Sequence, residues 1–291
     1  MEDLISKAAT LLEALPYIQK FRSAKFVVKY GGSFMDSPDE QVRQSVARDV
    51  VFLEAVQIKP TVVHGGGKAI SRALGKSGIE TRFEQGLRVT DAKSVEVVDD
   101  VLSRQLNPEI VRMINSLGGK AQGFSGTEIF TCKKLDMRDP DGNPVDIGYV
   151  GQVTGVNTGP LLECLEKDYV PVISPTALGD DGHVYNCNAD VAAAHAAIAL
   201  QARRLVFMSD VPGLMEDPND DQTVIPHLQI SQVDGLKQKG IVAKGMIPKV
   251  DSAVEAIRTG VDKVSFVDGR LTHSVLLEIF TDKGVGTEIV L

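Results

Sequence analysis

The clearest chemical signals in this sequence are lysines and glycines that follow short apolar runs. In the stretch KFVVKYGGS (25–33), strand-forming residues lead to Lys29, and Gly31 and Gly32 follow at once. Glycine lets backbone N–H groups approach an anion closely, and lysine adds a full positive charge. This stretch therefore predicts a phosphate-binding turn at the carboxyl end of a buried strand. A lysine that only extends into solvent beside an ordinary turn would give the same pattern.

A second glycine run follows a second apolar stretch. The segment TVVHGGG (61–67) ends in three glycines, and a helix is predicted directly afterwards at 68–76. Free N–H groups in such a loop, with the partial positive charge of a helix N-terminus, are suited to bind an anion. One glycine run is explained by a tight turn, whereas two runs at two strand ends favour paired anion-binding loops. We interpret His64 as a core or supporting histidine rather than a catalyst.

Arg88 lies between apolar residues in the segment GLRVT (86–90). A guanidinium in such a setting is suited to clamp a carboxylate with two parallel hydrogen bonds. A structural ion pair with a residue of the same chain is the alternative interpretation.

Two later motifs add further polar groups. The segment NCNAD (186–190) opens an alanine-rich helix that Asn188 or Asp190 could cap, but three polar groups exceed what a cap requires. The segment KGMIPK (244–249) carries two lysines. These lysines are either solvated or, together with SDVPGL (209–214), positioned to wrap a triphosphate.

Composition excludes several other classes of function. The net charge of −8 argues against a nucleic-acid partner, because phosphate contacts need a basic face. Neither GxxxxGK[ST] nor GxGxxG occurs, which disfavours P-loop and dinucleotide enzymes. The three cysteines are widely spaced and form no metal-binding motif, so we expect free thiols in a reducing compartment. Without a predicted membrane span or signal peptide, we expect a cytoplasmic protein with no membrane partner.

Strands alternate with helices along the chain, which predicts an α/β fold with an open, mainly parallel central sheet sandwiched by helices, in two lobes. The expected strands are 25–30, 61–63, 169–174, 205–209 and 263–267, and the expected helices are 3–15, 39–57, 68–76, 91–106, 108–117, 161–168, 190–202, 231–239, 246–259 and 271–280. Hairpins and loops are expected in 127–160, with a hairpin turn at 180–182. Pro171 suggests an irregular or edge strand.

The first helix carries an apolar stripe made of Leu4, Ala8, Leu11, Leu12 and Leu15. Because this helix precedes the first strand, the stripe must pack either on its own lobe or against another subunit. A proline follows at position 16, and we expect it to break or kink the helix.

Taken in order, six motifs resemble the amino acid kinase family over nearly the whole chain. They are KYGGS (29–33), VVHGGG (62–67), GLRVT (86–90), NCNAD (186–190), SDVPGL (209–214) and KGMIPKV (244–250). GLRVT together with NCNAD separates this sequence from the members that act on aspartate, glutamate, carbamate or uridylate. The resemblance implies transfer of the ATP γ-phosphoryl group to the side-chain carboxylate of N-acetyl-L-glutamate, in arginine biosynthesis. Mg²⁺ would be carried by the ATP phosphates, with no metal ligands from the chain.

The same resemblance implies a role for each residue of the site. Lys29 and Lys249 would neutralise the transferred phosphoryl group, and Asp190 would hold both lysines in place. The implied substrate-binding residues are Gly66, Gly67, Arg88 and Asn186, with Arg88 on the α-carboxylate. The implied nucleotide-binding residues are Gly31, Gly32, Asp210, Leu214, Lys244 and Gly245.

The resemblance also implies a domain organisation and regulation. Residues 1–22 would be an oligomerisation helix, 23–180 the N-acetylglutamate-binding lobe and 181–291 the ATP-binding lobe. A homodimer, or a hexamer built as a trimer of dimers, is expected, with L-arginine as effector and a PII-type signalling protein as a further partner. The implied arginine site comprises Tyr17, Glu278, Gly284 and Gly286. A sister kinase for another carboxylate or carbamate, and a non-catalytic amino-acid sensor, are the competing hypotheses.

Overall fold

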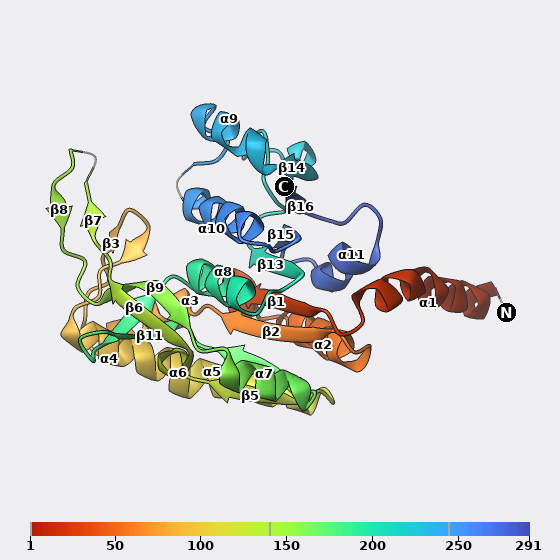
Figure 1. Cartoon of the computed structure of the whole chain (residues 1–291), viewed down its shortest axis with the longest axis horizontal. Coiled ribbons are helices and arrows are strands. Elements are labelled where there is room, and N and C mark those ends of the chain that lie inside the picture. Colours follow the sequence, from red (N-terminus) through yellow and green to blue (C-terminus); the bar gives the residue numbers. More distant parts are fainter. Residues whose placement is uncertain (1, 140, 244) are drawn as a thin grey trace.

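The computed structural model describes residues 2–139, 141–243 and 245–291, with the backbone alone at 2–4, 6–8, 33 and 34. In this part of the chain the main sheet has eight strands, and all neighbouring pairs are parallel except β15 and β16 (Figure 1). In spatial order they are β14 (His227–Gln229), β16 (Thr287–Val290), β15 (Lys263–Asp268), β13 (Arg204–Ser209), β1 (Lys25–Tyr30), β2 (Lys59–His64), β10 (Val170–Ile173) and β5 (Ala121–Phe124). The predicted open, mainly parallel sheet is confirmed.

Helices cover both faces of this sheet (Figure 1). One face packs against α7 (Gly159–Glu166), α8 (Ala189–Ala199) and α10 (Met246–Arg258), and the other against α2 (Glu40–Ala55), α5 (Asn107–Ser116) and α11 (Ser274–Phe280). Successive side chains of a strand point to opposite faces, so Val27 packs with the first group and Phe26 and Val28 with the second. Burial on both faces explains why the strand sequences are continuously apolar.

The strand order keeps the two halves of the sequence apart within one sheet. The strands β5, β10, β2 and β1 all come before residue 180, and β13, β15, β16 and β14 all come after it. The halves meet where β1 pairs with β13, from Phe26 opposite Arg204 to Lys29 opposite Phe207. Ligands of open α/β sheets bind outside the carboxyl ends of such central strands. The ends of β1, β2 and β13 are therefore where a site is expected.

Besides α7 and β10, the segment between β5 and α8 forms smaller β-structures. The strands β6 (Phe130–Lys134), β9 (Val150–Val156), β11 (Thr176–Gly179) and β12 (Val184–Cys187) close into a four-stranded barrel. The hairpin predicted at 180–182 joins β11 to β12 through Gly182, which has φ of 80°. The antiparallel pair β7 (Met137–Arg138) and β8 (Pro144–Val145) projects from one end of the molecule in Figure 1. The prediction of hairpins in 127–160 is thus confirmed.

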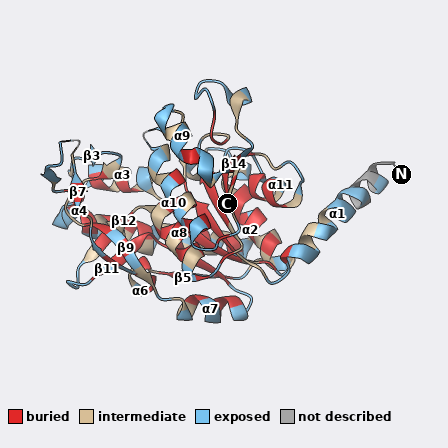
Figure 2. Ribbon diagram, turned by 45° about the horizontal axis from the view of Figure 1, so that its top comes forward, coloured by how far each residue is buried: buried red, intermediate tan, exposed pale blue. Residues whose placement is uncertain are grey.

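The expected break at Pro16 is wrong, because α1 runs without interruption from Glu2 to Phe21. Proline removes one backbone donor and leaves the carbonyl of Leu12 without its helical partner. Leu12 is 67 % exposed, so water can satisfy that carbonyl. Leu11 is 70 % exposed, and Figure 2 shows α1 reaching away from the rest of the chain. Leu15 is 43 % exposed, so the apolar stripe finds no cover on its own lobe at these three positions. The side chains of the stripe residues at 4 and 8 are not described.

Pro171 was expected to mark an irregular or edge strand, and the edge alternative is wrong. β10 lies between β2 and β5, one strand in from the edge. The Val170 N–H donates to Lys120 on the β5 side, and pairing with β2 begins only at Val172. The missing donor of Pro171 therefore falls where no ladder hydrogen bond to β2 is made.

The helical segment after β4 (Leu87–Arg88) differs from its prediction. Two helices were expected around Pro108, but α4 (Ala92–Asp99), a π-helix (Asp100–Leu106) and α5 follow one another without a break. Asp91 caps α4 as predicted, accepting the Ser94 N–H at 2.7 Å. Among the described residues, no helix has the length and apolar character needed to cross a membrane.

Gly126 opens the short helix α6 (Gly126–Ile129), where a Cβ would lie 2.0 Å from the Thr176 carbonyl oxygen and 2.2 Å from that of Ser174. Backbone atoms cannot swing aside, so Gly126→Ala should lower the free energy of unfolding by about 1–3 kcal/mol or more. Gly75→Ala is the matched control: it lies exposed in α3 (Gly67–Lys76) with open space around its Cβ. This substitution should instead stabilise by up to about 1 kcal/mol. Urea denaturation of both variants measures the difference, and equal stabilities would contradict this packing.

Candidate active site

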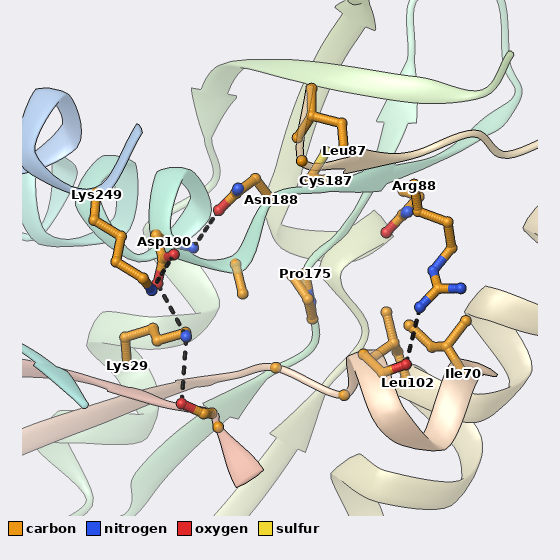
Figure 3. A pocket seen from close by; sticks show the side chains of 18 of the residues that line it. Lys29, Ile70, Leu87, Arg88, Leu102, Pro175, Cys187, Asn188, Asp190 and Lys249 are labelled. Carbon is orange, nitrogen blue, oxygen red and sulfur yellow. Dashed lines mark hydrogen bonds and ion pairs between the residues drawn. The ribbon is translucent and has the colours of Figure 1, made fainter. Parts of the chain in front are cut away.

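Two lysines from distant parts of the chain meet one aspartate beside the ends of the central strands. Lys249 Nζ donates to Asp190 Oδ2 at 2.6 Å, and Lys29 Nζ lies 3.0 Å from Asp190 Oδ1 (Figure 3). The Lys29 and Asp190 side chains are only 9 % and 10 % exposed. The structure therefore brings the three predicted catalytic residues together, and Lys29 does not extend into solvent.

The local sequence explains how these side chains are placed. On β1, Lys29 shares a face with Val27, the face that α8 and α10 cover. Asn188 is the N-cap of α8, and its Oδ1 accepts the Asp190 N–H at 2.8 Å. Because Asn188 performs the capping, the Asp190 carboxylate is left to pair with the lysines. Lys249 lies in the first turns of α10, which packs against α8.

The charges of this cluster shift the pKa values of Asp190 and Lys249. Burial by itself would raise the pKa of Asp190, but the charges of Lys29 and Lys249 outweigh burial and hold that pKa below its ordinary value. Burial, and then the positive charge of Lys29, lower the pKa of Lys249, while Asp190 opposes both effects. The carboxylate is therefore ionised, and it is the group that allows two ammonium groups to share a buried site.

The two glycine loops lie in contact beside this cluster. A Cβ on Gly31 would lie 3.1 Å from both Gly65 N and Lys29 Nζ, so a larger residue would crowd the lysine. The Gly65 N–H donates to the Tyr30 carbonyl at 2.7 Å, which ties the second loop to the end of β1. In the described part of the chain, the N–H groups of Gly66 and Gly67 at the start of α3 have no acceptor. These two amides can receive an anion.

A pocket of about 330 Å³ lies between these groups and Arg88 (Figure 3). Its lining includes ten of the predicted residues: Lys29, Gly31, Gly32, Gly66, Gly67, Arg88, Asn186, Asp190, Asp210 and Lys249. Apolar side chains complete the walls: Ile70, Phe83, Leu87, Leu102, Val150 and Pro175. The pocket therefore combines anion-binding groups with an apolar wall, as expected for a small organic acid.

Arg88 lies at the opposite end of the pocket from the lysines (Figure 3). Its Nη2 donates to the Gly67 carbonyl and to Ser71 Oγ, each at 2.9 Å, and its guanidinium lies 4.8 Å from the Phe83 ring centre. Burial lowers the pKa of Arg88, yet a guanidinium stays charged in proteins. Among the described residues no carboxylate pairs with Arg88, so the alternative of a structural ion pair is wrong. Its positive charge remains for a ligand.

Of the other predicted residues, Asn186 lines the pocket, whereas Gly245 and Leu214 are not among the described residues that line it. Asn186 Nδ2 donates to Thr90 Oγ1 at 3.3 Å and faces the pocket. Gly245 precedes α10 as its N-cap, and Lys244 lies outside the described residues. Leu214 is buried in the core, and its N–H donates to Thr287 Oγ1. The prediction that Leu214 lines the nucleotide site therefore has no support from its side-chain position.

Sequence reasoning missed the hairpin that carries Arg88. The strands β3 (Phe83–Glu84) and β4 (Leu87–Arg88) are joined by Gln85 and Gly86, with φ of 46° and 82°. Both central residues have positive φ, which is the condition for a type I′ turn, and a glycine at the second position was the available signal. The hairpin puts Phe83 and Leu87 beside the pocket, where the motif alone showed only an arginine.

The four residues predicted to bind arginine lie around the junction of α1 and α11. The Tyr17 hydroxyl hydrogen bonds to Asp282, which follows α11. The buried Glu278 carboxylate accepts the Val285 N–H at 3.0 Å and lies 2.5 Å from the Cβ position of Gly284. A Cβ on Gly286 would lie 1.9 Å from the Phe266 carbonyl oxygen, so close packing requires glycine there.

Comparisons with known proteins agree with this geometry. A model of the amino acid kinase family matches residues 24–268. An acetylglutamate kinase from Akkermansia muciniphila is 46 % identical, with 99 % of this chain and 96 % of that protein aligned. An acetylglutamate kinase from a Thermoanaerobacter species is 45 % identical, with 99 % and 94 % aligned.

The fold is also found among solved structures. The N-acetylglutamate synthase from Neisseria gonorrhoeae, in complex with coenzyme A and N-acetyl-glutamate, superimposes with a TM-score of 0.81 at 24 % identity. That alignment covers 98 % of this chain and 63 % of the synthase, and at this identity it shows the fold alone. The family match and the two relatives decide the assignment: this chain belongs to the amino acid kinase family.

Proposed function

We propose that this protein transfers the γ-phosphoryl group of ATP to the side-chain carboxylate of N-acetyl-L-glutamate, the reaction for which its relatives are named. The observation that carries the proposal is the pairing of Lys29 and Lys249 with Asp190 next to the free amides of Gly66 and Gly67. Phosphoryl transfer needs positioning and charge neutralisation more than covalent chemistry. This cluster offers both.

Charge balance supports the role of each group. The transferred phosphoryl group carries negative charge on its oxygens, and the two ammonium groups with one carboxylate carry one net positive charge. The Gly66 and Gly67 N–H groups would bind oxygens of the attacking carboxylate and of the phosphoryl group. A carboxylate is ionised at neutral pH, so the acceptor needs no general base.

The other end of the pocket suits the rest of the substrate. Arg88 would bind the α-carboxylate, and Asn186 would hydrogen bond near the acetamido group. Apolar lining from Leu87, Leu102 and Val150 matches the methylene and methyl groups of an acylated amino acid.

The nucleotide would approach from the second half of the chain. Asp210 follows β13 and Gly245 precedes α10, and Lys244 lies outside the described residues. With these three residues assigned to the nucleotide, residues 181–291 are proposed as the ATP-binding lobe and 23–180 as the acceptor lobe. Among the described residues, no group of three or more His, Cys, Asp or Glu side chains is arranged to hold a metal ion. By the family resemblance we assign Mg²⁺ to the ATP phosphates, with Gly31 and Gly32 near the same phosphates.

Assembly and regulation are proposed from the N-terminal helix. The exposed Leu11, Leu12 and Leu15 favour burial of α1 against a second copy of the chain, as in a hexamer built from dimers. The corner formed by Tyr17, Glu278 and the residue range 284–286 offers a buried carboxylate and backbone groups to a cationic effector such as L-arginine. A PII-type signalling partner remains part of this proposal, with no surface assigned to it.

The proposed reaction is tested by ADP release, which should occur with N-acetyl-L-glutamate and not with L-glutamate, L-aspartate or carbamate. Lys29→Ala should lower kcat roughly 10²–10³-fold, because one preorganised donor to the transition state is lost. Lys25→Ala, at the other end of the same strand, is the matched control and should leave kcat unchanged. Near wild-type turnover by Lys29→Ala would rule out this role, and strong activity with another acceptor would favour a sister kinase.

Arg88→Lys keeps the positive charge but loses the bidentate hydrogen bonding of a guanidinium to a carboxylate. We expect KM for N-acetyl-L-glutamate to rise roughly tenfold to a hundredfold, since a hydrogen bond to a charged group contributes about 1.5–3 kcal/mol. The value of kcat should change less, because the α-carboxylate does not react. The exposed Arg82, on the approach to the same hairpin, provides the control Arg82→Lys. An unchanged KM in Arg88→Lys would place the α-carboxylate elsewhere.

Deletion of residues 1–20 should leave catalysis intact and reduce the assembly to dimers, because it removes the exposed apolar stripe and keeps the buried Phe21. Analytical ultracentrifugation measures the size of the assembly. The ADP-release assay, with and without L-arginine, measures turnover and its inhibition by arginine. A deletion variant that sediments like the full chain would show that α1 does not join subunits.

A further inference from the structure

His64 ends β2 and is fully buried, directly before the glycine loop that carries Gly66 and Gly67. Its Nδ1 lies 2.9 Å from the Gly65 carbonyl oxygen. Its Nε2 lies 3.4 Å from the side-chain nitrogen of Asn107, a buried residue at the start of α5. The imidazole thus links the helix start to the backbone of the loop. None of the roles assigned above uses this contact.

The hydrogen bonds fix which ring nitrogen carries the proton. A carbonyl oxygen can only accept, so His64 Nδ1 must be protonated and donate to Gly65. Asn107 Nδ2 also lies 2.9 Å from the Val172 carbonyl oxygen, which identifies it as the amide nitrogen rather than the oxygen. Nε2 therefore accepts from Asn107 and carries no proton. Burial lowers the pKa of His64 to about 4, which keeps the ring neutral at physiological pH.

This bond also orients the next N–H group. The carbonyl of Gly65 and the N–H of Gly66 belong to one planar, trans peptide unit, so they point in opposite directions. With the carbonyl held toward His64, the Gly66 N–H must point away from the buried ring. Gly66 lines the pocket, and its N–H has no acceptor among the described residues.

The π-helix Asp100–Leu106 supports the other side of the same peptide. A Cβ on Gly66 would lie 2.7 Å from Leu102 Cδ2 and 2.6 Å from Leu106 Cδ1, so these two side chains pack directly on the glycine. Asn107 follows the π-helix at once. Wide helical turns of this kind occur frequently at functional sites. Here the turn presents the packing surface to the glycine loop and is followed by the residue whose amide donates to His64.

We infer that His64 is a positioning residue: oriented by Asn107, it holds the Gly65–Gly66 peptide so that the Gly66 N–H faces the reacting group. The catalytic part of this inference rests on the function proposed above. A histidine that only filled the core would contribute packing but would not control the direction of this N–H.

Two amide substitutions separate the positioning role from packing. His64→Asn keeps a donor near the Nδ1 position, whereas His64→Gln places its amide near Nε2 and loses the donor to Gly65. We expect His64→Asn to stay close to wild-type kcat and His64→Gln to lose roughly tenfold to a hundredfold, somewhat less than complete removal of one such donor. KM for ATP should change little in both. Equal kcat in two variants of equal stability to urea would overturn the inference.

Nuclear magnetic resonance tests the same hydrogen bonds of His64 without any substrate. In ¹⁵N-labelled wild-type protein at neutral pH, the His64 signals should report a protonated Nδ1 and a bare Nε2. The Gly66 amide signal should move in His64→Gln and stay in place in His64→Asn. A protonated Nε2, or an unmoved Gly66 signal in His64→Gln, would overturn the inference. Failure of the proposed function alone would instead appear as wild-type protein with these signals but no turnover of N-acetyl-L-glutamate.

Discussion

One buried carboxylate that holds two ammonium groups together is the interaction on which the rest of this structure depends. Without Asp190, the ammonium groups of Lys29 and Lys249 would repel each other, and burial already lowers the pKa of Lys249. Removing one partner of a buried ion pair costs about 3–5 kcal/mol, because a charge is left uncompensated. With Asp190 present, the cluster keeps one net positive charge on three side chains that are largely buried. An incoming phosphoryl group supplies the negative charge that this site lacks.

The fold supplies the three elements that this cluster needs. The strand β1 carries Lys29 on the face that α8 and α10 cover, and those helices carry Asp190 and Lys249. The sheet is continuous, so the two halves of the sequence meet without a flexible connection between β1 and β13. The glycine loops then bring backbone amides alongside the lysines, and a Cβ at Gly31 would crowd the neighbouring loop at 3.1 Å from Gly65 N. Charge and amide donors are in this way fixed to rigid strand and helix ends.

Sequence patterns predicted most of the site because its members are short motifs with strong local causes. An apolar run before Lys29, glycines after it and a polar helix start at 186–190 each have one favoured local structure. The predictions failed where tertiary context decides. Pro16 is tolerated because water can hydrogen bond to the carbonyl that loses its partner in an exposed helix. Pro171 is tolerated because no ladder hydrogen bond to β2 is made at its position. The short strands β5, β14 and β16 were missed because sheet pairing, rather than their own sequence, makes them strands.

The sequence by itself determined the alternation of strands and helices, the two glycine loops and the identity of the charged residues, since these follow from side-chain periodicity and backbone freedom. Only the tertiary structure decided which charges share a site and which way each donor points. Arg88 could have formed an internal ion pair, and His64 could have been an ordinary core residue. Their partners, Gly67 and Ser71 for the arginine and Gly65 and Asn107 for the histidine, are set by folding. Contacts between residues far apart in sequence depend on how strands and helices pack, and no local pattern encodes that packing.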